Sequence, residues 1–410
     1  MRRLATSIVS ASIAVAVLEP RAPLMAAACP DGRNPRTEVG ARIQIAQKTL
    51  TATTNNPFVL SHVSPDKPVR YLRARVTART FGSGSWFVTA RDLRGHPLQT
   101  FSHDDFVENP DRWTGRIPGA VASIELTLIG NSTSPELAVT EYIAMPEKAT
   151  NPYYSVKHIG QEEYRPLYPA DSSVTRTLRS WGDVTGFVMG SWGDRLWGCS
   201  GVVVGPRLFL TAWHCGGAGA DVMPETAFWT PDICRDLLID LSWDDDRSSR
   251  DFSCAKVVDQ DKERDFALLE IAAVASAGEP RPAVINLAAL DATQPTPLVV
   301  IHHPLYMQKQ ITRDCFVAAW KFPGWALNTA GIDFSHDCDT EGGSSGAPVF
   351  NDAGQLIGLH HYGHAIDPIT CAETEHPPAN KAVRLDSIIR FLEDNKDKNG
   401  HIVDKMTIIR

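Results

Sequence analysis

The nine residues Thr340–Pro348 read TEGGSSGAP, and the apolar pair Val349-Phe350 follows them directly. Glycine reaches backbone conformations that are closed to other residues, so a loop of this composition can aim several backbone amides at one point. Such a loop can expose a serine hydroxyl and hold two amide donors beside it, which is what acyl-transfer chemistry needs. The same composition also suits an ordinary Gly/Ser turn. The loop therefore predicts a nucleophile only if partners for it occur elsewhere in the chain.

The first partner is a histidine that lies between two cysteines. Residues 198–215 read GCSGVVVGPRLFLTAWHC, in which two β-rich runs flank the turn Gly205-Pro206. This pattern predicts a β-hairpin, and His214 follows its second run. Cys199 and Cys215 bracket the hairpin, and a disulfide between them would hold the histidine in a fixed position. A lone histidine at a strand end is usually structural, but one inside this bracket is a candidate partner for the serine.

The second partner is Asp265, which opens the apolar run Phe266–Leu269. A carboxylate that enters an apolar strand needs a hydrogen-bond partner, and an imidazole Nδ1–H is a suitable one. A capping or surface aspartate is the alternative. The rival aspartates belong to a largely polar run between Asp240 and Asp251 that we expect to be a solvated loop; they are Asp240, Asp244, Asp245 and Asp246.

In order and in motif, these residues resemble the chymotrypsin/trypsin-like serine endopeptidases, specifically the bacterial branch with the glutamyl and lysyl endopeptidases. Leu210–Cys215 is similar to the family's histidine motif, with Trp213 where alanine or glycine is commoner. Asp265–Leu269 is similar to its aspartate motif, and Gly343–Pro348 to its serine motif. The likeness covers roughly residues 180–395. It implies a chymotrypsin-like double six-stranded β-barrel. The helical periodicity of Leu385–Leu392 predicts a C-terminal helix that packs on the second barrel.

The resemblance implies a catalytic triad of His214, Asp265 and Ser345, with the backbone N–H groups of Gly343 and Ser345 as the oxyanion hole. Ser345 is preferred over Ser344 because it directly precedes the second glycine of the motif. Ser344 stands where the digestive enzymes carry an aspartate that pairs with a new N-terminal amine. A neutral serine cannot form that ion pair, so activation by that switch is not expected. The implied mechanism needs no cofactor.

The resemblance to glutamyl endopeptidases also implies a substrate preference. Thr340 and His360 stand at the spacings from Ser345 at which those enzymes bind an acidic side chain. A hydroxyl and an imidazole can both donate hydrogen bonds to a carboxylate. Asp339 is the competing feature, because digestive trypsins carry their lysine- and arginine-selecting aspartate at that offset. We expect cleavage after acidic residues, with a Lys/Arg-directed protease as the alternative.

Several other histidines are not expected to be catalytic. His360, His361 and His364 cluster in sequence, but their spacing from Asp367 and Cys371 matches no zinc pattern, so we expect no metal site. A strand and loop that line the substrate pocket explain the cluster better. His302-His303-Pro304 is interpreted as a structural turn.

The N-terminus predicts export. A positive start, an apolar run from Leu4 to Leu18 and the ending Ala26–Ala28 are typical of a secretory signal peptide at residues 1–28. The run is too short to favour a membrane span. The eight cysteines suggest disulfides and a secreted protein, extracellular or periplasmic. Beyond Cys199–Cys215, the candidate pairs are Cys234 with Cys254, and Cys338 with Cys315 or Cys371; Cys29 is left over.

The remaining sequence divides into regions. Alternating polar and apolar runs between turn residues predict a β-sandwich-like accessory or pro-domain over residues 29–150. A proline-containing linker at 151–180, a protease domain at 181–395 and a tail at 396–410 follow. The net charge of −8 argues against nucleic acid as a partner. We expect a monomer that acts on protein or peptide substrates.

Two other classes of protein remain open. A catalytically silent homologue could act as a binding or adhesion protein if Trp213 or nearby loops blocked the cleft. An esterase or acyltransferase could use the same residue types, but those enzymes usually have the order Ser, Asp, His and a helix after the serine. Here the order is His214, Asp265, Ser345, and a strand follows.

Overall fold

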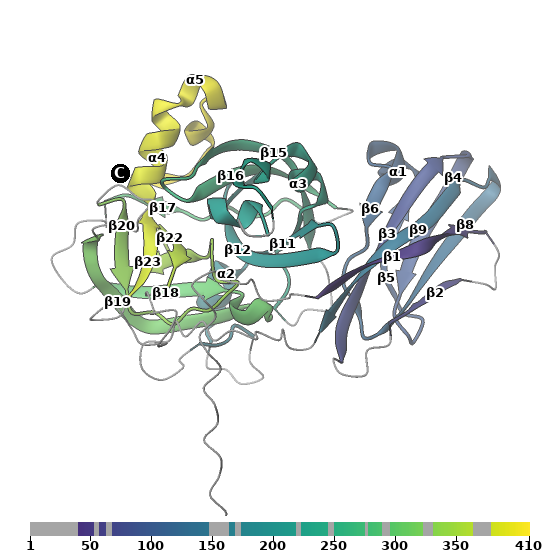
Figure 1. Cartoon of the computed structure of the whole chain (residues 1–410), viewed down its shortest axis with the longest axis horizontal. Coiled ribbons are helices and arrows are strands. Elements are labelled where there is room, and N and C mark those ends of the chain that lie inside the picture. Colours follow the sequence, from purple (N-terminus) through teal and green to yellow (C-terminus); the bar gives the residue numbers. More distant parts are fainter. Residues whose placement is uncertain are drawn as a thin grey trace, which may run out of the picture.

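The computed structural model describes residues 40–52, 57–62, 68–146, 164–168, 174–218, 223–244, 250–274, 278–288, 296–322, 331–363 and 379–410. Within these ranges the chain is mostly β, with a two-sheet sandwich beside two barrels (Figure 1). The predicted signal peptide, most of the predicted linker, Cys29, His364, Asp367 and Cys371 lie outside the described residues.

The N-terminal part is a sandwich of two antiparallel sheets. One sheet contains, in spatial order, β1 (Ala41–Leu50), β9 (Glu136–Pro146), β3 (Val69–Thr80) and β6 (Asp111–Trp113), with β7 (Ile117–Pro118) beside β3. The other contains β2 (Phe58–Ser61), β8 (Val121–Thr133), β4 (Ser83–Arg91) and β5 (Pro97–Ser102), and α1 (His103–Glu108) follows β5. Leu72 and Val139 from one sheet pack with Trp86 and Ile124 from the other in one apolar core. The sandwich-like fold predicted from the alternating pattern is confirmed.

The first barrel is a closed ring of antiparallel strands. Its spatial order is β11 (Thr185–Trp192), β12 (Arg195–Gly205), β13 (Leu208–Thr211), β16 (Phe266–Ala273), β15 (Asp251–Asp261) and β14 (Leu238–Asp240), which pairs back with β11. All four residues of β13, LFLT, are buried. A strand buried on both faces explains why this stretch is continuously apolar rather than alternating.

The second barrel closes in the same way. Its ring is β18 (Pro297–His302), β19 (Gln310–Phe322), β20 (Asp333–His336), β23 (Asn380–Arg384), β22 (Leu356–Tyr362) and β21 (Pro348–Asn351), and β21 pairs with both β22 and β18. Three short strands extend the sheet: β10 (Arg165–Pro166), β17 (Ile285–Asn286) and β24 (Ile408–Ile409). The predicted double six-stranded barrel is therefore confirmed.

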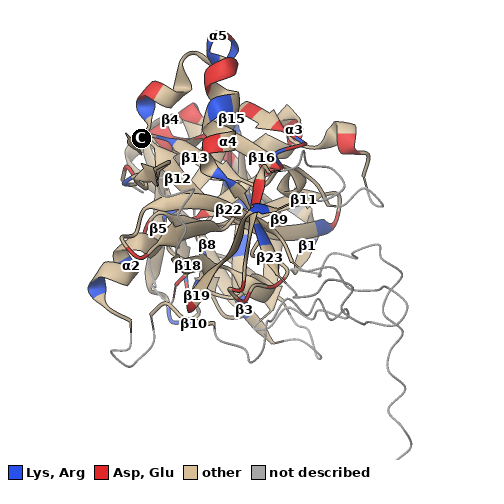
Figure 2. Cartoon of the chain, turned by 90° about the vertical axis from the view of Figure 1, so that its left-hand side faces the viewer, with Lys and Arg blue, Asp and Glu red and all other residues tan. Residues whose placement is uncertain are grey.

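Short helices connect and cover the barrels. They are α2 (Arg176–Gly182), α3 (Pro231–Asp236), α4 (Leu385–Asp394) and α5 (Lys396–Asn399), with single turns η1 (Trp213–Gly216), η2 (Glu225–Ala227), η3 (Pro304–Tyr306) and η4 (Ile402–Lys405). The predicted C-terminal helix is α4, which buries Leu385, Ile388, Ile389 and Leu392 at helical spacing. Figure 2 shows basic and acidic residues side by side on α4 and α5, whose outer faces are polar. None of the helices in the described ranges is both long and apolar enough to cross a bilayer.

Disulfides link Cys199–Cys215, Cys234–Cys254 and Cys315–Cys338 within the described residues. The first joins β12 to the turn after β13, as the bracketing cysteines suggest. The third joins β19 to the segment after β20, so Cys338 pairs with Cys315 rather than with Cys371. Three disulfides suggest that the protein folds in an oxidising compartment, extracellular or periplasmic.

Buried ion pairs join the sandwich to the first barrel. The guanidinium of Arg73, on β3, lies 2.7 Å from Asp240 and 2.9 Å from Asp251, and all three side chains are buried. Arg116 lies 2.8 Å from the same Asp240 carboxylate. Burial disfavours the charge of Arg73, but Asp251 and Asp240 outweigh burial and raise the pKa of Arg73.

The expectation of a solvated loop from Asp240 to Asp251 is wrong for three of its aspartates. Asp240, Asp244 and Asp251 are buried, because each faces a basic side chain from a neighbouring element. Asp244 lies 3.7 Å from the Lys309 ammonium. The polar composition of the run therefore reflects internal ion pairs as well as solvent.

Candidate active site

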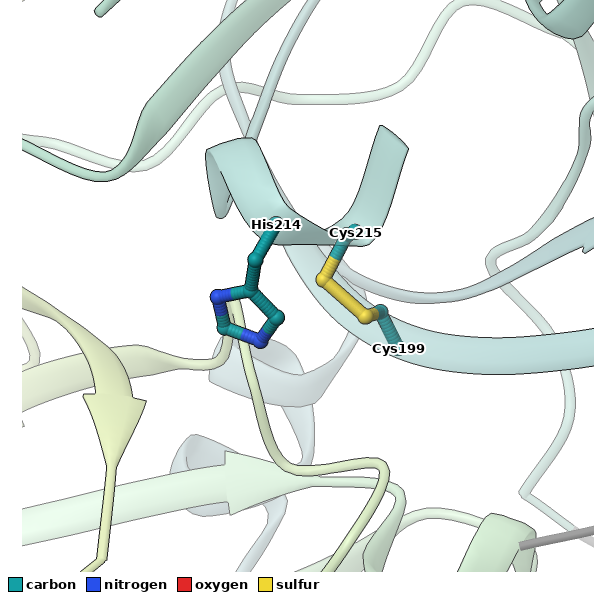
Figure 3. Close-up of side chains that lie close together, drawn as sticks. All are labelled: Cys199, His214 and Cys215. Carbon is teal, nitrogen blue, oxygen red and sulfur yellow. A yellow bond between two sulfur atoms is a disulfide. The ribbon is translucent and has the colours of Figure 1, made fainter. Parts of the chain in front are cut away.

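His214 lies directly after β13, in the turn η1. Its neighbour Cys215 is tied to Cys199 of β12, and Figure 3 shows the imidazole beside the sulfur pair. The histidine side chain is 21% exposed, so the ring reaches the surface while its backbone is anchored by the disulfide. The hairpin and its staple thus position one imidazole at the end of the first barrel.

Asp265 immediately precedes β16 and has φ of 44°. Aspartate adopts this left-handed region more readily than most residues. Its Oδ2 lies 2.7 Å from His214 Nδ1, and its Oδ1 accepts a 2.9 Å hydrogen bond from the His214 backbone N–H. Because a carboxylate only accepts hydrogen bonds, Nδ1 carries a proton and neutral His214 keeps Nε2 as a base.

The acidity of Asp265 is set by its neighbours. Burial alone raises the pKa of a carboxyl group. The charge and hydrogen bond of His214, together with the hydrogen bond and charge of His361, outweigh that effect and lower the pKa of Asp265 well below its usual value. Asp265 is therefore a carboxylate across the physiological pH range.

The serine loop packs against the histidine hairpin. The Ser345 carbonyl accepts a 2.8 Å hydrogen bond from the Ser200 N–H and lies 3.8 Å from Cys215 Sγ. Gly343 has φ of 98°, and a Cβ at this position would lie 2.5 Å from the His303 carbonyl oxygen. Only glycine fits such a backbone without displacing its neighbour. These contacts bring Ser345 next to the residue that follows His214.

Some backbone N–H groups of this loop donate hydrogen bonds within the protein, and others do not. The N–H groups of Ser344 and Gly346 donate to Glu341 and His360 carbonyls at 2.9 and 2.7 Å. By contrast, the N–H groups of Gly343 and Ser345 donate no hydrogen bond to any residue that the structure describes. Two free amides beside a serine are the donors that an oxyanion hole requires.

A hydrogen-bond network supports the loop from below. His302 Nδ1 lies 2.7 Å from Ser344 Oγ, which accepts a 3.0 Å bond from the Glu341 N–H. Thr312 Oγ1 lies 3.2 Å from the other ring nitrogen of His302. Sequence reasoning treated His302 as part of a structural turn. The geometry gives it a definite contact, because its imidazole holds the Ser344 hydroxyl next to Ser345.

Sequence reasoning missed the role of His361. This buried imidazole lies 3.0 Å from Asp265 Oδ2 through Nδ1 and 3.2 Å from Asp333 Oδ2 through Nε2. Burial lowers the pKa of His361, but the Asp333 charge and the hydrogen bonds to both aspartates raise it to about 9. The only sequence signal was an additional imidazole directly after His360.

The predicted pocket residues are all buried in the second barrel: Asp339, Thr340 and His360. Thr340 Oγ1 has no hydrogen-bond partner within the part of the chain that the structure describes. His360 Nδ1 lies 3.3 Å from His336 Nε2. Burial and the charge of His361 lower the pKa of His336 to about 3, so His336 is neutral. The Asp339 carbonyl accepts a 3.0 Å bond from Thr312.

Among the residues that the structure describes, two groups of side chains are close enough to suggest a metal site. Cys199, His214 and Cys215 form one group, and Cys315, Asp337 and Cys338 form the other. In each group the two sulfurs are joined in a disulfide and offer no thiolate. These clusters therefore reflect disulfide packing.

Residues 199–359 match the family model described as a trypsin-like peptidase domain. A curated relative is the Asp/Glu-specific dipeptidyl-peptidase of Shewanella putrefaciens, 31% identical over 85 residues. That match spans 20% of this chain and only 12% of the relative's length.

Two solved structures show the protease Rv3671c in an inactive form, one of them the M. tuberculosis H37Rv protein with a serine-to-alanine substitution. They are 18% and 17% identical and have TM-scores of 0.40 and 0.38. The first match covers 55% of this chain and 94% of the solved chain. The second covers 53% of this chain and 91% of the solved chain. The matched range runs from β12 of the first barrel to β22 of the second, so this part of the chain is similar to a trypsin-like peptidase domain.

Proposed function

We propose that this protein is a secreted serine endopeptidase in which Ser345 is the nucleophile, His214 the general base and Asp265 the residue that orients it. The observation that carries the proposal is the 2.7 Å contact between His214 Nδ1 and Asp265, beside a serine loop with two unused amides. An esterase of the usual strand–serine–helix type is disfavoured, because β21 follows Ser345.

The proposed reaction follows from these positions. His214 Nε2 takes the proton of Ser345 Oγ as that oxygen attacks the scissile carbonyl carbon. His214 then gives the proton to the leaving nitrogen while the C–N bond breaks. Water repeats the sequence on the acyl-enzyme, which releases the acid and restores the serine. The Gly343 and Ser345 amides bind the oxyanion, and losing one such donor typically costs about 3–4 kcal/mol of transition-state stabilisation.

We further propose a preference for an acidic residue before the scissile bond. Thr340 Oγ1 is a buried hydroxyl without a partner among the described residues, and such a donor gains most from a charged acceptor. His360 supplies an imidazole from the neighbouring strand β22. The name of the Shewanella relative agrees with this preference. The competing Lys/Arg preference would require the Asp339 carboxylate to face the substrate.

Export is part of the proposal. The three disulfides support an extracellular or periplasmic site of action. Residues 1–28 would be removed as a signal peptide, and the mature chain would act on protein or peptide substrates as a monomer.

A covalent serine-hydrolase probe tests the nucleophile. A fluorophosphonate should label the wild-type protein at Ser345 and leave Ser345→Ala unlabelled, whereas Ser344→Ala should still be labelled. Labelling of Ser345→Ala, or of no protein at all, would contradict the endopeptidase assignment; the second result would favour the silent binding protein.

A peptide-library digest tests the preference. Cleavage should occur mainly after Glu or Asp, and Thr340→Val should lower kcat/KM for a Glu substrate by about tenfold, the value of one hydrogen bond to a charge. A matched substrate with Gln in place of Glu should lose much less. Cleavage mainly after Lys or Arg would instead assign the pocket to Asp339.

A further inference from the structure

The imidazole of His361 lies between two buried carboxylates. Nδ1 is 3.0 Å from Asp265 Oδ2, and Nε2 is 3.2 Å from Asp333 Oδ2. Asp265 comes from the turn before β16 of the first barrel, whereas Asp333 begins β20 of the second. All three side chains are withdrawn from solvent. A continuous chain of contacts thus runs from His214 through Asp265 and His361 to Asp333.

The hydrogen-bonding roles of the two carboxylates determine how many protons the His361 ring carries. A carboxylate oxygen only accepts, so each ring nitrogen must present an N–H to its aspartate. A neutral imidazole has one N–H, whereas an imidazolium has two. The geometry therefore calls for a positively charged ring, balanced by Asp333, beside the Asp265 carboxylate.

We propose that His361 is a positioning residue, an imidazolium that fixes the Asp265 carboxylate for His214 and is itself held by Asp333. The proposal rests on the proposed serine-peptidase function. Asp265 Oδ2 is shared by the two Nδ1 atoms of His214 and His361, and Oδ1 is bound by the His214 backbone N–H. With three donors on two oxygens, the carboxylate has little freedom to rotate away from His214.

His361 also reaches the nucleophile. Its backbone carbonyl accepts a 3.4 Å hydrogen bond from Ser345 Oγ. The residue therefore contacts both Asp265 and Ser345, so its orientation affects the two partners of His214 together.

The other ionisable groups around His361 are few. His336 lies on β20 beside Asp333, and the charge of His361 is among the causes that lower the pKa of His336. Lys381, on the neighbouring β23, lowers the pKa of His336 too. Tyr362 packs its ring 4.8 Å from that of His361, and His214 lies across Asp265. Within the described part of the chain, Asp265 and Asp333 supply the negative charge that keeps the His361 imidazole protonated.

Kinetics of His361→Gln and Asp333→Asn test the proposal. In His361→Gln, kcat should fall about tenfold or more while KM stays within about twofold, because the base is misplaced but the pocket is intact. Removing the positive charge beside Asp265 makes it easier for the site to take up a proton, so the acidic limb of kcat/KM should move up by about half a pH unit. Asp333→Asn should lower kcat in the same way.

Matched controls separate this effect from a general loss of stability. Asp259 is a buried carboxylate on β15 that accepts a hydrogen bond from Asn399 rather than from His214 or His361, and His62 is bonded to Tyr142 in the sandwich. Asp259→Asn and His62→Gln should leave both kcat and the acidic limb unchanged. If either control shifted the limb as much as His361→Gln does, the positioning role would be refuted.

The proton count can be read directly in the wild-type protein. In nitrogen-15 spectra of the imidazole rings, the His361 signals (assigned by their loss in His361→Gln) should show both ring nitrogens protonated at pH 7.5. In Asp333→Asn, one of the two protons should be lost. A neutral His361 in the wild type would overturn the proposal, even if the protein is an active peptidase. Conversely, the probe could fail to label Ser345 while His361 is doubly protonated. That result would refute the peptidase function but would still support the charged His361 between Asp265 and Asp333.

Discussion

Hydrogen-bond capacity assigns a task to each polar residue around Ser345. Ser344 shows this most simply. Its hydroxyl oxygen accepts a hydrogen bond from the Glu341 N–H and lies 2.7 Å from His302 Nδ1. Removing the hydroxyl deletes the hydrogen bonds that Ser344 Oγ makes with His302 Nδ1 and with the Glu341 N–H. We expect Ser344→Ala to lower kcat about tenfold with little change in KM, since the loop amides would be held less firmly. His302→Gln should have a similar effect, and an unchanged kcat in both would show that the loop holds itself.

His361 also predicts a dependence of stability on pH. Its pKa of about 9 in the folded protein lies above the ordinary 6.5, so folding strengthens proton binding. The resulting stabilisation is complete below pH 6.5 and is lost as the pH rises through about 9. By linkage, the shift corresponds to about 3 kcal/mol. Urea unfolding between pH 6 and 10 should show this loss in the wild type. His361→Gln should show a flatter profile, and parallel profiles would contradict the assignment.

At the scale of elements, the β12–β13 hairpin and its disulfide hold the proposed base. Cys199 and Cys215 are separated by 16 residues, and a loop of that length is worth about 3 kcal/mol of stabilisation when closed. The double variant Cys199→Ser/Cys215→Ser should therefore unfold at lower urea and lose most of its kcat, because His214 adjoins the staple.

The Cys234–Cys254 pair, separated by 20 residues, is the matched control. Its removal should destabilise the protein by a similar amount, since the closed loops are of similar length. Activity below the unfolding transition should fall much less, because that disulfide joins α3 to β15 rather than holding His214. Equal losses of kcat in both double variants would mean that the hairpin staple has no special role.

At the scale of the whole molecule, the sandwich is joined to the first barrel through buried charge. Arg73 and Arg116, both from the sandwich side, face Asp240, and Arg73 also contacts Asp251. Arg73→Ala would leave Asp251 buried without its cation, which typically costs roughly 3–5 kcal/mol. The exposed pair Arg79–Glu136 offers the control, and Arg79→Ala should change stability by less than about 1 kcal/mol. Urea unfolding of both variants measures the difference; equal stabilities would show that the junction contributes little.

This junction also bears on the task of the sandwich. A segment locked by buried ion pairs is expected to stay with the barrels, so an accessory domain fits the contacts better than a pro-domain that is shed. Its boundaries, like the triad and the pocket residues, stay predictions.

Local pattern was enough for much of the fold. Alternation predicted strands such as β3 and β4, the β-rich runs around Gly205-Pro206 predicted the β12–β13 hairpin, and the 3.6-residue period predicted α4. The three motifs in the order His, Asp, Ser predicted the double barrel and the resemblance to trypsin-like peptidases. These patterns can be read from the sequence because each lies within a few adjacent residues.

The sequence by itself thus predicted the fold class, the resemblance to trypsin-like peptidases and the candidate triad. Only the tertiary structure decided that His361 meets Asp265, which is 96 residues away, and that Arg73 meets Asp240, 167 residues away. It also selected Cys315 as the partner of Cys338 and turned Asp240 and Asp251 from expected solvent-facing residues into buried ones. The physical reason is that closure of two barrels sets which distant side chains share a buried site. There, a charge must find its partner, whatever the separation along the chain.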